Sequence, residues 1–92
     1  MDLLTEDEIA AELSKVTGWA RERGSITCTV TRDDFRGAML FAGAVAYLAE
    51  EANHHPDISI QWNRVILSLS THSAGGLTAA DFSLAGKIAA LT

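Results

Sequence analysis

The sequence predicts an α+β fold, a four-stranded antiparallel sheet with three helices packed on one face, in the order αββαββα. Two stretches of alternating β-branched residues, each joined to a neighbouring strand by a short turn, indicate two hairpins. Apolar residues at helical spacing before, between and after the hairpins indicate three helices. Because consecutive hairpins pair antiparallel, the helices are expected to cover one face. A length of 92 residues fits a single domain, residues 1–92.

The first expected helix covers about residues 6–16. Thr5 and Glu8 have the spacing of a capping box, in which the hydroxyl and the carboxylate each bind a free backbone N–H group. A glycine shortly afterwards ends the helix. Residues 19–22 and 26–31 are expected to pair as the first hairpin, because the second stretch alternates Ile, Cys and Val with threonine.

The second expected helix covers about residues 34–52 and is rich in alanine and glycine, so that another helix could approach it closely. Asn53 is its expected C-cap, and the proline that follows prevents continuation. The second hairpin is expected to join residues 58–62 to residues 65–72. Its second strand would therefore end at His72.

The last expected helix begins with a second capping box, which Thr78 opens and Asp81 closes in place of the usual glutamate. Helix capping fully explains the aspartate. The same side chain could also orient a histidine, because a carboxylate has two oxygens.

Charge and cysteine content exclude several classes of function. Seven Lys and Arg stand against twelve Asp and Glu, a net charge of -5, and without a basic cluster neither nucleic acid nor an anionic membrane is an expected partner. The single Cys28 excludes an intrachain disulfide and fits a reducing compartment. The first residues have no basic and apolar leader, and the apolar stretch 38–49 is too short to span a bilayer. A cytoplasmic location is expected.

All three histidines fall within residues 54–72. His54 and His55 follow the long helix, whose C-terminus stabilises an imidazolium, and His72 is expected at a strand end. On a continuing helix Glu50 would share a face with His54 and could orient its ring. Histidines at such positions suit general acid–base catalysis, although capping helices or filling turns would explain them as well.

Other chemistries have less support in the sequence. Three histidines could bind zinc, but adjacent residues of an extended backbone face opposite ways and the i, i+4 pair is absent, so no metal is expected. Cys28 lies in an apolar strand, and no nucleophile-elbow motif surrounds Ser70. Trp19 and Trp62 could stack on a flat heterocycle, or they could pack in the core or at its rim.

Several of these residues together resemble the signature of the pterin-4a-carbinolamine dehydratase family. That signature has an acidic residue, three spacers, His-His-Pro, an aromatic residue, a histidine ten residues later and a downstream aspartate. The matching residues are Glu50, His54-His55-Pro56, Trp62, Leu69-Ser70-Thr71-His72 and Asp81. The resemblance extends over nearly the whole chain, and it implies the same fold as the periodicity does.

The resemblance implies a 4a-hydroxytetrahydrobiopterin dehydratase, a hydro-lyase. Such an enzyme converts 4a-hydroxytetrahydropterin to quinonoid dihydropterin and recycles the pterin after aromatic amino-acid hydroxylation, without a metal or redox cofactor. His54, His55 and His72 match the catalytic and pterin-binding histidines. The residues expected to support them or to bind substrate are Glu50, Trp62, Asp81, Trp19, Ser70 and Thr71. Two positions depart from many relatives, which have a basic residue at Ala80 and an aromatic residue at Ile58, and these departures concern substrate affinity.

The resemblance also implies a homodimer or homotetramer, formed through helix packing and a sheet edge, that acts on a small pterin. Two other functions stay open at this point. One is a pterin-binding or protein-assembly module that stabilises dimers of another protein. The other is a pterin role outside hydroxylase recycling, for instance in molybdopterin metabolism.

Overall fold

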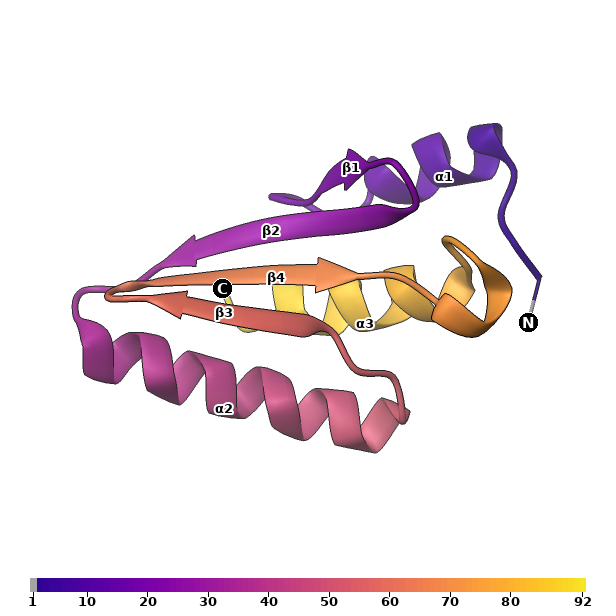
Figure 1. Cartoon of the computed structure of the whole chain (residues 1–92). Coiled ribbons are helices and arrows are strands. Elements are labelled where there is room, and N and C mark those ends of the chain that lie inside the picture. The colour runs from indigo at the N-terminus through magenta and orange to yellow at the C-terminus, as the bar shows by residue number, and fades with distance from the viewer. Residues whose placement is uncertain (1) are drawn as a thin grey trace.

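The structure is a computed structural model that describes residues 2–92 (Figure 1). Its elements follow the predicted αββαββα order, with a short 3-10 helix before the last helix. In chain order they are α1 (Glu6–Leu13), β1 (Ala20–Glu22), β2 (Ser25–Thr31), α2 (Phe35–Ala52), β3 (Asp57–Gln61), β4 (Arg64–Leu69), η1 (His72–Ala74) and α3 (Ala79–Ala89). The predicted α+β class is confirmed.

The four strands form one antiparallel sheet in the order β1-β2-β4-β3. Each hairpin contributes one inner strand, and β2 pairs with β4 from Ile26 opposite Leu69 to Thr31 opposite Arg64. The outer strands β1 and β3 form the edges. The two hairpins therefore pair through their inner strands. Helix α2 begins at one end of the sheet and ends at the other (Figure 1).

The core lies between the sheet and the helices. Alternate residues of the inner strands are buried, as period-two patterning requires. Helix α2 contacts β3, β4 and α3, and its buried face consists of small residues with one phenylalanine. The fully buried side chains of the core include Ile26, Leu67, Leu69, Leu84 and Ile88. Cys28 is 8% exposed, and burial raises the pKa of its thiol.

Capping residues set the helix ends as expected. Thr5 and Glu8 complete the first capping box, and Asp34 accepts a hydrogen bond from the backbone N–H of Gly37 at 2.7 Å. Asn53 ends α2 in the left-handed region, with φ 50° and ψ 42°. The structure thus confirms the sequence predictions for the long helix and its C-cap.

Two predicted element ends differ from the structure by more than one residue. Helix α1 ends at Leu13 rather than near residue 16, because the N–H groups of Lys15 and Val16 form i→i−3 turns. Strand β4 ends at Leu69, so His72 does not end a strand but begins η1. The chain folds back there because the N–H of Thr71 donates to the carbonyl of Gly76 at 2.9 Å.

No helix within residues 2–92 is long and apolar enough to cross a membrane.

Candidate active site

The strand register brings two loops together at one end of the sheet. Asp57 is the first residue of β3 and pairs with Ser68 of β4. Beyond this pair the ladder ends, and His54 of the α2–β3 loop and Thr71 of the β4–α3 loop both bond to Asp81. Residues that are far apart in the sequence therefore meet where α2 ends and α3 begins (Figure 1).

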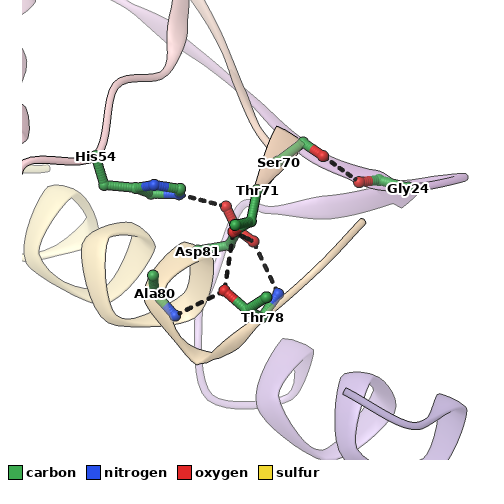
Figure 2. A network of polar contacts seen from close by, with 7 residues as sticks. All are labelled: Gly24, His54, Ser70, Thr71, Thr78, Ala80 and Asp81. Atoms are coloured by element: carbon green, nitrogen blue, oxygen red, sulfur yellow. Dashed lines mark hydrogen bonds and ion pairs between the residues drawn. The ribbon is translucent and has the colours of Figure 1, made fainter. Parts of the chain in front are cut away.

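A buried carboxylate joins the two loops. Asp81, in the first turn of α3, has no exposed surface, and its Oδ1 lies 2.6 Å from Nε2 of His54, whose side chain is 15% exposed. Its Oδ2 accepts hydrogen bonds from the backbone N–H of Thr78 at 2.9 Å and the hydroxyl of Thr71 at 2.8 Å (Figure 2). One oxygen thus caps the helix while the other holds the histidine, which confirms that the two roles coexist.

The serine and threonine before His72 have partners within the chain. The Ser70 hydroxyl donates to the carbonyl of Gly24 at 2.7 Å and ties the end of β4 to the β1–β2 turn (Figure 2). The Thr71 hydroxyl bonds to Asp81 and lies 2.8 Å from the hydroxyl of Thr78. Both hydroxyls, expected among the substrate-binding groups, therefore hold the site together in this structure.

Glu50 pairs with a different histidine from the one expected. Its Oε2 lies 2.5 Å from Nε2 of His55, and both side chains are exposed. The expectation that Glu50 orients His54 is wrong. The left-handed Asn53 ends α2 just before His54, so the helix does not continue to this histidine. His54 then leaves the face of α2, and its backbone N–H turns back to the carbonyl of Ala49 at 3.1 Å.

His72 follows Thr71 directly and is exposed. Because Thr71 bonds to Asp81, which binds His54, the third histidine belongs to the same end of the sheet. Within residues 2–92, no group of three His, Cys, Asp or Glu side chains is arranged to hold a metal ion.

Of the two tryptophans, Trp62 lies away from this site and Trp19 is a core residue. Trp62 lies in the β3–β4 turn with φ 54° and is 68% exposed, at the end of the sheet opposite His54. Trp19 is 7% exposed and packs in the core. Of the two departures, Ile58 lies on the edge strand β3 and is 39% exposed, and the N–H of Ala80 donates to the Thr78 hydroxyl.

One residue of the network, Thr78, was predicted only as a helix cap. Its side chain also contacts the hydroxyl of Thr71, so it is linked to the histidine through Asp81. The capping box in the sequence could have identified this role of Thr78. Asp81 closes that box and was also expected at the candidate site.

The fold and the site define a small α+β protein in which a buried carboxylate orients a histidine beside two exposed ones. Residues 2–91 match the family model described as pterin 4 alpha carbinolamine dehydratase. The chain belongs to this family.

Relatives from two bacteria are similar over nearly their full lengths. A protein of Roseiflexus castenholzii is 51% identical over 86 residues, 94% of this chain and 92% of its own. One of Thermomicrobium roseum is 48% identical over 91 residues, 99% of this chain and 98% of its own. Both are named, provisionally, pterin-4-alpha-carbinolamine dehydratase.

Two solved structures share the fold. A Brucella melitensis protein described as a transcriptional coactivator/pterin dehydratase superposes with a TM-score of 0.91, at 37% identity over 96% of both chains. A pterin dehydratase-like protein identified as a RuBisCO assembly factor in the alpha-carboxysome has a TM-score of 0.64 at 22% identity, covering 79% of this chain and 84% of its own. The second likeness shows the fold alone.

Proposed function

We propose that the protein dehydrates 4a-hydroxytetrahydropterin to quinonoid dihydropterin by histidine general acid–base catalysis, and that it recycles tetrahydropterin in the cytoplasm after aromatic amino-acid hydroxylation. The observation that carries the proposal is the His54–Asp81 pair, at 2.6 Å with the carboxylate fully buried. A fixed imidazole beside a buried carboxylate is suited to moving a proton at a defined position. Family membership supports a pterin as the substrate.

The reaction needs two proton transfers. A histidinium protonates the hydroxyl on C4a, the C4a–O bond breaks, and water leaves as the N5 lone pair forms the N5–C4a double bond. A second histidine accepts the N5 proton, so the protein's proton count returns to its starting value. The pterin ring supplies the electron pair, and the side chains supply only the proton donor and acceptor.

We assign the acid–base pair to His54 and His72 and ring binding chiefly to His55. The buried partner of His54 supports the first assignment, while the exposed pairing of His55 with Glu50 supports a contact at the rim. Alanine at position 54 or 72 is therefore expected to lower kcat, and alanine at position 55 is expected mainly to raise KM. A loss confined to KM at both 54 and 72 would contradict the assignment.

Stopped-flow measurement of freshly generated 4a-hydroxytetrahydropterin tests the proposal. The compound dehydrates spontaneously, so rates are compared with the protein-free reaction. The wild type is expected to accelerate the reaction, and His54→Ala to remove about 10²–10⁴-fold of that acceleration. Lys15→Ala, at an exposed position just after α1, is the control for an unrelated surface change. No acceleration by folded wild type would refute the enzyme and favour a pterin-binding or assembly role.

We also propose that the protein is a homo-oligomer that packs through the outer face of α2. Large apolar side chains on that face are 47–70% exposed, and they are Phe35, Met39, Leu40 and Tyr47. Sedimentation velocity of Leu40→Glu is expected to show dissociation, since a buried charge opposes assembly. Leu91→Glu, an exposed leucine beyond α3, is the matched control. An unchanged sedimentation coefficient for Leu40→Glu would contradict this interface.

A further inference from the structure

A chain of hydroxyl groups leads from the start of α3 to the candidate catalytic histidine. The backbone N–H of Ala80 donates to the Thr78 hydroxyl at 3.3 Å. The Thr78 and Thr71 hydroxyl oxygens lie 2.8 Å apart, and Thr71 donates to Oδ2 of Asp81 at 2.8 Å. Both threonines are almost completely buried, Thr78 at 0% and Thr71 at 7% exposure. Figure 2 shows that these groups converge on one side of the carboxylate.

The direction of each hydrogen bond follows from the number of protons available. A hydroxyl has one proton, so Thr71, which donates to Asp81, must accept from Thr78. Oδ2 therefore receives two donors, the Thr71 hydroxyl and the Thr78 backbone N–H. Its position is fixed independently of the histidine.

The remaining oxygen determines the tautomer of His54. An ionised carboxylate only accepts hydrogen bonds, so Oδ1 requires a proton on Nε2 at 2.6 Å. In the neutral ring that proton leaves Nδ1 with its lone pair. The hydrogen-bonding groups around Asp81 thus distinguish the two ring nitrogens before any substrate binds.

We propose that Thr71 is a positioning residue: its hydroxyl, held by Thr78, fixes the Asp81 carboxylate so that His54 carries its proton on Nε2 and exchanges the catalytic proton through Nδ1. The catalytic part of this proposal rests on the proposed dehydratase function. The tautomer in the resting protein does not, and it can be observed without turnover.

The first test is long-range ¹H–¹⁵N NMR of histidine-labelled protein, with the His54 signals assigned by their loss in His54→Gln. Wild type at a pH where the ring is neutral is expected to show one tautomer, with the proton on Nε2. Thr71→Val removes the donor with little change in volume and leaves Oδ2 held only by the Thr78 N–H. The carboxylate is then expected to turn partly away from Nε2, which gives a mixture of tautomers. A proton on Nδ1 of His54 in wild type would overturn the proposal even if Thr71→Val does not fold.

The second test is kinetic. Thr71→Val is expected to lower kcat about tenfold, with KM changed less than about twofold, because one hydrogen bond to a charged group is lost. Thr71→Ser keeps the hydroxyl and is expected to restore kcat. Thr5→Val loses a capping hydroxyl in α1 and serves as the stability-matched control. Two results would overturn the proposal. One is an unchanged kcat in Thr71→Val, and the other is a kcat in Thr71→Ser that is as low as in Thr71→Val.

The two proposals fail in different ways. If wild type does not accelerate dehydration, the dehydratase function fails, whereas the tautomer measurement still decides the role of Thr71. If wild type is active and Thr71→Val retains both kcat and the single tautomer, the dehydratase function stands and the positioning role is refuted.

Discussion

Replacing Asp81 with asparagine changes one atom of a fully buried group that has three hydrogen-bond donors around it. The amide has one acceptor oxygen and one NH₂ group, which cannot accept. If the oxygen stays toward Thr71 and Thr78, the NH₂ group faces Nε2 of His54. The histidine must then move its proton to Nδ1 or leave the contact.

Two losses are expected from this single substitution. The wrong tautomer and the lost charge should lower kcat by about 10²–10⁴-fold, the range that proton transfer contributes. A poorly satisfied buried donor should lower the free energy of unfolding by about 1–3 kcal/mol. For a domain of this size each kcal/mol corresponds to a fall in Tm of about 4–8 °C.

Glu8→Gln is the matched control, because Glu8 occupies the same position in the capping box of α1 and binds no histidine. Stopped-flow dehydration and thermal unfolding should be measured on both variants. We expect Glu8→Gln to retain kcat while Asp81→Asn loses it at a temperature where both are folded. If folded Asp81→Asn retains kcat within about twofold, the carboxylate does not orient a catalytic histidine, and the reasoning from the buried carboxylate–histidine pair is refuted.

Three further predictions concern the rest of the fold. Cys28 should react slowly with iodoacetamide until the protein unfolds, because burial raises the pKa of its thiol, and rapid labelling of native protein would contradict this. Leu67→Ala should lower the free energy of unfolding by about 2–5 kcal/mol in a denaturant titration, since the side chain is fully buried, and a smaller loss would indicate local collapse. Arg21 lowers the pKa of Glu6 through a hydrogen bond and its charge, so their pairing stabilises the protein above the ordinary carboxyl pKa of 4.5 and loses this effect as the pH falls through the lowered value. Arg21→Ala should therefore lower Tm slightly near neutral pH and not in strong acid, and an equal fall at both would contradict the pairing.

Local signals in the sequence predicted the fold well. The capping boxes, the alternating strands and Asn53 involve residues within a few positions of one another, and the structure confirms them. The end of β4 could not be predicted from such local signals. Alternation continues through residue 72, whereas the backbone leaves the ladder after Leu69 to close a turn onto Gly76.

The sequence indicated that Asp81 could orient a histidine, but not which histidine it contacts. His54 and Asp81 are 27 positions apart, and their contact depends on the register of β3 against β4 and on the start of α3. Helical spacing suggested Glu50 as the partner of His54, because that rule assumes a helix that continues. The left-handed Asn53 turns the backbone, so Glu50 pairs with His55 instead of His54. The spacing of residues in the sequence does not predict such a change in side-chain direction.

The turn that contains η1 is closed at its base. Thr71 and Gly76 exchange both backbone hydrogen bonds, at 2.9 and 3.3 Å. The N–H groups of Ala74 and Gly75 also donate to the carbonyl of Thr71, each at 3.0 Å, so the tip of the turn is tied to the residue whose hydroxyl holds Asp81. An insertion at the tip would therefore displace Thr71 together with the adjoining His72. The turn should tolerate neither added residues nor an attached reporter.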